Sequence, residues 1–177
     1  MAEPEQEVFE EEEEDYEDAD QSPQERFLTR CRFMNEPAAI RIWNEFKDQI
    51  DPCKPDEFGT TPLHAISANG LVELLSIIVK IPGINLNVKT GSGNTSLHYA
   101  ALNGNNKIIK ILLDAGADPK IKNDQGQTAY FEAASRFAKK KTTDEKETEL
   151  VDMLLGPDSE IPESIDATIE KEDLDGI

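Results

Sequence analysis

Residues suited to catalysis or metal binding are scarce in this chain. Its 177 residues include two cysteines, Cys31 and Cys53, and two histidines, His64 and His98. The spacing of the cysteines matches no metal site, and we expect both to stay reduced. No stretch brings together a nucleophile, a base and an oxyanion donor. The sequence therefore predicts a protein that is not an enzyme and that holds no metal and no cofactor.

Long apolar runs are missing as well. The longest, residues 71–81, is interrupted by Glu73 and Lys80, and a helix needs about 20 apolar residues to cross a bilayer. The first residues are acidic, whereas a secretory signal peptide carries positive charge ahead of an apolar run. We therefore expect no membrane contact, and a protein of the cytoplasm and nucleus.

Basic side chains are absent from residues 1–25, which carry 13 acidic ones. Residues 144–177 hold 13 acidic side chains and two lysines, whereas residues 26–143 hold 16 basic and 11 acidic side chains. Segments with this much charge and so little apolar surface do not fold alone. The sequence thus predicts a mildly basic body between a disordered acidic arm, residues 1–23, and an acidic tail, residues 157–177.

The arm contains an unbroken acidic run that has two possible roles. It could serve only solubility, or it could contact a cationic partner. The residues of the run are Glu10, Glu11, Glu12, Glu13, Glu14 and Asp15.

The body contains a repeated motif. Residues 59–65, Gly-Thr-Thr-Pro-Leu-His-Ala, return in similar form at 93–99, and a weaker copy begins at Gly126 after nearly the same interval. In the middle copy Thr95 is placed to cap one helix, and Gly104 to turn the chain into a second. A helix pair this short cannot bury its apolar faces alone, so its copies should stack.

These motifs resemble the ankyrin repeat in residue type and in period. The resemblance implies an all-α ankyrin-repeat solenoid, built from helix-turn-helix units with hairpin loops. It divides the body into a capping helix pair (24–55) and three repeats (56–88, 89–122 and 123–156). The third repeat departs from the pattern, because it carries an insertion with Lys139, Lys140 and Lys141 and its second apolar set, residues 150–155, comes late.

Helical spacing predicts a helix pair, with Phe27, Leu28, Cys31 and Phe33 on one helix and Ile40, Trp43 and Phe46 on the next. The spacing of Trp43 with Ile40 and Phe46 favours a core position for Trp43. The two histidines occupy equivalent positions in successive repeats. In that setting an imidazole is expected to bridge neighbouring repeats through hydrogen bonds to backbone groups. Gly91-Ser92-Gly93 lacks the lysine that follows in a phosphate-binding loop, and it falls where a hairpin is expected.

A narrower resemblance covers residues 89–104, 123–126 and 129–133. These stretches are similar to the small fungal ankyrin-repeat chaperones of a small-subunit ribosomal protein that carries a KH domain. In that group an aromatic residue follows the middle histidine, as Tyr99 does here, and the last repeat reads Ala-x-Phe-Glu-Ala. The resemblance implies a monomeric chaperone that keeps a basic ribosomal protein soluble before its assembly into the ribosome.

The net charge of −19 points to the same class of partner. A strongly acidic protein attracts basic proteins and repels nucleic acid, so we expect no direct nucleic-acid binding. The alternative is an ankyrin-type inhibitor or scaffold that binds a transcription factor, a kinase or another signalling protein.

The ankyrin resemblance places partner binding on an inner face formed by the hairpins and the first helix of each repeat. Phe58 is the expected anchor, because a hairpin-tip aromatic residue has no required core role and could fill a pocket on the partner. The predicted partner-binding residues of this face are Glu57, Phe58, Thr60, Ala68, Asn69, Ser92, Asn94, Leu102, Asn103, Gln125, Gln127, Ser135 and Arg136.

Overall fold

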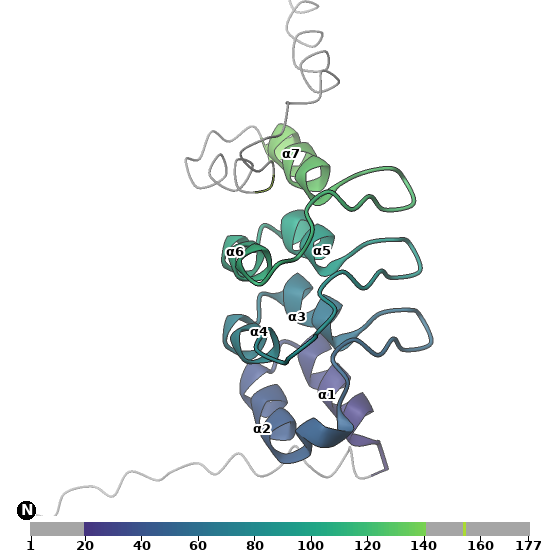
Figure 1. Ribbon diagram of the computed structural model, residues 1–177, viewed down its shortest axis with the longest axis vertical. Helices are drawn as coiled ribbons and strands as arrows, with labels where there is room; N and C mark the ends of the chain where they lie inside the picture. Colours follow the sequence, from purple (N-terminus) through teal and green to yellow (C-terminus); the bar gives the residue numbers. More distant parts are fainter. Residues whose placement is uncertain (1–19, 141–153, 155–177) are drawn as a thin grey trace, which may run out of the picture.

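The computed structural model describes residues 20–140 and Leu154 (Figure 1). This part of the chain contains helices and loops and no strand. The elements are α1 (Pro23–Arg32), α2 (Glu36–Phe46), the short 3₁₀ helix η1 (Lys47–Gln49), α3 (Pro62–Asn69), α4 (Val72–Ile78), α5 (Ser96–Asn103), α6 (Asn106–Asp114) and α7 (Ala129–Lys140).

The helices form two rows, with three long hairpin loops projecting to one side (Figure 1). An inner row of α1, α3, α5 and α7 packs in sequence order beside the loops, and α2, α4 and α6 form an outer row behind it. The all-α solenoid predicted from the sequence is therefore confirmed. The predicted late helix of the third repeat lies outside the described residues, except for Leu154, which is buried in the core.

Side-chain caps explain where the helices begin. Ser22 and Glu25 form a capping box around Pro23, so α1 starts at Pro23, one residue before the predicted boundary of the capping pair. Thr61 caps α3 in the same way, since its hydroxyl accepts a hydrogen bond from the N–H of His64. Thr95 is the N-cap residue of α5, as predicted.

The inner helices end on residues in the left-handed region of backbone space. Gly70 closes α3 at a φ of 73° and Gly104 closes α5 at 72°. In the capping pair Met34, with a φ of 58°, lies at the matching point between α1 and α2. A side chain costs about 1–2 kcal/mol in this region, which is why glycine is favoured there.

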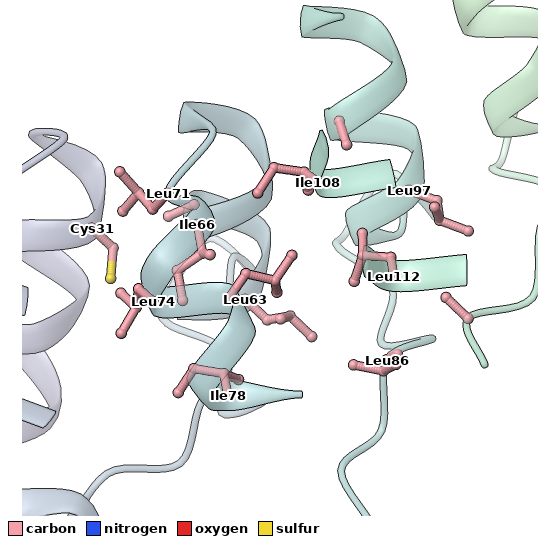
Figure 2. Close-up of a cluster of buried hydrophobic side chains, with 14 of the residues drawn as sticks. Cys31, Leu63, Ile66, Leu71, Leu74, Ile78, Leu86, Leu97, Ile108 and Leu112 are labelled. Carbon is pink, nitrogen blue, oxygen red and sulfur yellow. The ribbon is translucent and has the colours of Figure 1, made fainter. Parts of the chain in front are cut away.

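One apolar core runs through the stack. Figure 2 shows side chains of α1, α3, α4, α5 and α6 converging, among them Leu63, Leu74 and Ile108, which are fully buried. Trp43 is buried against Phe27, with ring centroids 5.7 Å apart, so its predicted core role is confirmed.

Phe33, which the sequence pattern placed on the first helix with Phe27, Leu28 and Cys31, does not share their apolar face. α1 ends at Arg32, and Phe33 is its C-cap residue. Its side chain is 75% exposed.

Candidate protein-binding surface

The predicted inner face is organised by three hairpins of the same geometry. In each one a main-chain N–H donates to the carbonyl four residues on, at 2.9 Å: Asp56 to Thr60, Thr90 to Asn94 and Asn123 to Gln127. The same three positions then accept a bond from the glycine N–H three residues later. Repetition of these bonds places corresponding tip residues in register along the stack.

Side chains at the hairpin bases hold the first and third loops in shape. Asp56 Oδ1 accepts bonds from the N–H groups of Phe58 and Thr60, at 2.9 and 2.8 Å. Asn123 Oδ1 does the same for Gln125 and Gln127. Burial of Asp56 disfavours its ionised form, but the bonds from Thr60, Phe58 and the Arg32 guanidinium outweigh this effect and hold its pKa below the ordinary value.

None of the thirteen predicted residues on this face is buried. Phe58 is 80% exposed at the tip of the first hairpin, and Leu102 is 50% exposed at the end of α5. Both are apolar side chains without a core role, which suits them to contact a partner. The remaining exposed members are Glu57, Ser92, Asn103 and Gln125, and the half-buried members are Thr60, Ala68, Asn69, Asn94, Gln127, Ser135 and Arg136.

Two asparagines among the predicted residues also join successive inner helices. The side-chain amide of Asn69 donates to the carbonyl oxygens of Cys31 and Arg32, at 2.8 and 3.1 Å. The amide of Asn103 donates to Ala68 O at 2.9 Å. These bonds join successive inner helices, so replacing either residue would change the stack as well as the surface.

The sequence patterns missed an apolar pair beside this face. Phe33 and Met34 follow α1 directly and are 75% and 65% exposed. They occupy the positions that Asn69, the last residue of α3, and Gly70 hold in the next helix pair. The amino-acid sequence could have revealed this pair, because two large apolar residues stand where the later repeats have Asn-Gly.

The histidines act as structural bridges, as predicted. His64 Nε2 lies 2.9 Å from Val88 O, and His98 Nε2 lies 3.0 Å from Gln127 O. In both, Nδ1 accepts the N–H of the helix-capping threonine, so the ring is neutral with its proton on Nε2. Burial lowers the pKa of both histidines, and bonds to the carbonyl oxygens oppose that shift in part.

A polar hollow of about 430 Å³ opens between the second and third hairpins. Two acidic residues line it: Asp124, which no sequence motif had singled out, and Glu132, which belongs to the last-repeat motif but was not predicted as a binding residue. No short motif marks it, because its two walls come from the hairpins of different repeats. The residues that line it are Gly91, Ser92, Asn94, Asn123, Asp124, Gln125 and Glu132.

Other kinds of site find no support in residues 20–140 or at Leu154. No group of three or more His, Cys, Asp or Glu side chains there is arranged to hold a metal ion. None of the described helices combines the length and the apolar content needed to cross a bilayer. Burial raises the pKa of the Cys31 thiol to about 12, which makes it a poor nucleophile.

Some of the predicted features fall outside the described residues. The acidic run, residues 10–15, and Lys141 are among them, and nothing is described of the side chains of Lys139 and Lys140, which end α7. Their roles stay predictions.

Comparison with known proteins agrees with this geometry. A family model described as "Ankyrin repeats (3 copies)" matches residues 35–123 and 77–164. The chain is 32% identical over 112 residues to the E3 ubiquitin-protein ligase KEG of Arabidopsis thaliana, covering 63% of this chain and 7% of the relative. It is 35% identical over 98 residues to human BCL-6 corepressor-like protein 1, covering 55% of this chain and 5% of that protein.

A third relative is the Ankyrin repeat domain-containing protein 13C of Xenopus tropicalis. It is 29% identical over 113 residues, which are 62% of this chain and 22% of the relative. The chain thus spans a small part of the length of each of these proteins.

Proposed function

The chain belongs to the ankyrin-repeat family, whose repeats are generally non-catalytic modules for protein–protein interaction, and from this premise we propose that it is a dedicated chaperone of a strongly basic protein. The client that we propose is a small-subunit ribosomal protein with a KH domain, bound before its assembly into the ribosome. Such a role places the protein in both the cytoplasm and the nucleus.

The distribution of charge is the observation that carries this proposal. A net charge of −19 is concentrated in residues 1–25 and 144–177, while the body between them is mildly basic. Ribosomal proteins are basic and aggregate readily away from RNA. Acidic arms beside a binding face can cover the cationic surface of such a client and keep RNA from it.

The narrower family resemblance supports the identity of the client. Tyr99 directly follows the middle histidine, and the last repeat carries Phe131 and Glu132 where the earlier repeats read His and Tyr or Ala. Both features match the small fungal chaperones that the sequence resembles.

The binding face has the mixture of groups that such a role requires. Phe58 and Leu102 offer exposed apolar side chains, and Glu57, Asp124 and Glu132 offer carboxylates on the same side of the stack. An apolar anchor can supply affinity, and surrounding charge can supply partner selection.

Capture from a cell extract tests the proposal. The full chain is immobilised, washed at low and then at high salt, and the retained proteins are identified by mass spectrometry. We expect one basic ribosomal protein of the small subunit to remain at high salt. Retention of a transcription factor or kinase in its place would overturn the chaperone proposal.

That outcome would favour the second candidate, an ankyrin-type regulator whose acidic arms cover a DNA-binding surface or another cationic site. Two relatives that this chain resembles are named a ubiquitin-protein ligase and a corepressor-like protein, and both names indicate regulatory proteins. The two candidates differ in the partner retained, so one experiment separates them.

A further inference from the structure

We propose that the hollow between the second and third hairpins is a receptor for a single arginine side chain of the protein partner. The inference rests on the proposed function in one respect, namely that the partner is a basic protein. It adds a defined site, with Asp124 and Glu132 as the charged groups and amide and hydroxyl groups around them.

The hydrogen-bonding state of the third hairpin, which forms one wall of the hollow, favours a cation over an anion. The main-chain N–H groups of Asp124, Gln125, Gly126 and Gln127 all donate within the protein, to Ser92 O, Asn123 Oδ1, Asn123 O and Asn123 Oδ1. Anion sites in loops depend on free N–H groups of this kind. A phosphate or carboxylate would therefore meet two negative charges, and on this wall no free main-chain donor.

The two carboxylates have no cation of their own among the described residues. Asp124 is exposed and Glu132 half-buried, and neither forms an ion pair in this part of the chain. Lys89 lies in the same region, since its charge acts on His98, but its Nζ donates to Lys122 O at 2.9 Å. The carboxylate oxygens of the hollow can thus accept hydrogen bonds from a cationic group of the partner.

Close packing of the two hairpins fixes one wall. Gly93 has a φ of 76°, and a Cβ built there would lie 2.5 Å from Asp124 Oδ1 and 2.8 Å from Asp124 N. The missing side chain lets the third hairpin approach the second. Asn123 Nδ2 also donates to Asn94 Oδ1 at 2.9 Å across the same gap.

The chemistry of arginine suits this arrangement better than that of lysine. A guanidinium group is planar, is always charged and carries five N–H donors, so it can bond to two carboxylates and to neighbouring carbonyl oxygens together. The volume of about 430 Å³ falls within the range of sites that enclose small ligands. Lysine would offer a point charge with three donors to the same groups.

The first test uses a small probe, so that it does not depend on the client. N-acetyl-arginine N-methylamide, its lysine counterpart and its citrulline counterpart are titrated into the isotopically labelled full chain, and backbone amide shifts are followed by NMR. We expect saturable shifts at Ser92, Asn94 and Gln125 with arginine, weaker ones with lysine and none with citrulline. Shifts spread over the acidic arms, without saturation at the hollow, would overturn the site.

Variants give the second test. Asp124→Asn combined with Glu132→Gln should abolish the arginine shifts. The matched control, Glu73→Gln with Asp114→Asn, removes two exposed charges of α4 and α6 away from the hollow and should leave the shifts intact. Equal loss in both variants would show that only net charge matters and would reject the site.

Client affinity then separates this site from the broader function. If the wild-type chain captures a basic client, the pocket variant should bind it about tenfold more weakly, as expected for loss of a charge-assisted contact, and the control within twofold. Unchanged affinity in the pocket variant would reject the site and leave the chaperone role standing. Absence of any basic client would reject the function, while the arginine titration still decides the site.

Discussion

His98 Nε2 lies 3.0 Å from the carbonyl oxygen of Gln127, so one imidazole joins α5 to the hairpin of the following repeat. His64 Nε2 lies 2.9 Å from Val88 O, two residues before the second hairpin begins at Thr90. In each ring Nδ1 also accepts an N–H from the helix-capping threonine. The repeats are therefore connected by groups that must stay neutral.

The stability of the fold should depend on pH through these two rings. Burial lowers the pKa of both below the reference value of 6.5. Below about pH 6.5 the two histidines therefore bind protons in the unfolded chain that they do not bind in the folded chain. The histidine contribution is fully present above that pH and is lost as the pH falls toward the folded-state pKa. Denaturant unfolding between pH 5 and 8 measures it.

A double variant isolates the effect of the histidines from that of the many carboxylates. His64→Gln with His98→Gln should be less stable at pH 7.5, by about 1–3 kcal/mol for each buried group left unsatisfied. Its stability should change less between pH 7 and pH 5.5 than that of the wild type. Parallel pH profiles of the two proteins would show that the histidines are not the titrating groups.

Met34 should be replaceable by glycine with a gain in stability. Its φ of 58° is in the region where Gly70 and Gly104 close the equivalent helices. Relief of this strain offsets the greater freedom of glycine in the unfolded chain, and we expect a net gain of about 0.5–1 kcal/mol. Met34→Ala keeps the strain and should give no gain; equal stability of the two variants would contradict the interpretation.

Phe58→Ala should weaken partner binding by about 2 kcal/mol or more without lowering the melting temperature. Its ring is 80% exposed and has no core role to lose. Lys110→Ala, at an exposed position on α6 of the outer row and away from the hairpins, is the control. Calorimetric titration with the client would contradict the hairpin-face prediction if Phe58→Ala bound as tightly as the wild type.

Deletion of residues 1–19 should slow association with the client and leave dissociation within a few-fold of the full chain. Interactions between exposed charges reach about 8–10 Å at physiological salt and mainly raise the encounter rate. The deletion retains Ser22, whose capping box with Glu25 starts α1. Stopped-flow kinetics at two salt concentrations test this prediction. An unchanged association rate would show that the arm contributes to solubility and not to client capture.

The sequence was sufficient for the features that are local or repeated. The Thr61–His64 and Thr95–His98 pairs recur at the repeat period, and they predicted both the helix starts and the bridging role of the imidazoles. Phe33 was misplaced because helical spacing does not reveal that α1 ends at Arg32.

The hollow between the second and third hairpins could not be predicted from the sequence, for a different reason. It depends on the contact of Gly93 with Asp124, two residues of different repeats, and on hydrogen bonds that consume the N–H groups of the third hairpin. Neither residue type is unusual for a hairpin, so only the stacked arrangement shows the two carboxylates facing a shared space. Non-local packing of this kind leaves no short motif.

Protection of a basic client from RNA-induced aggregation tests the central proposal most directly. A purified KH-domain ribosomal protein of the small subunit is mixed with RNA, and light scattering is followed with and without one molar equivalent of the full chain. The account predicts that the chain keeps the client soluble and that an unrelated acidic protein of similar net charge does not. Equal scattering with and without the chain, in a client that is otherwise folded, would contradict the chaperone function.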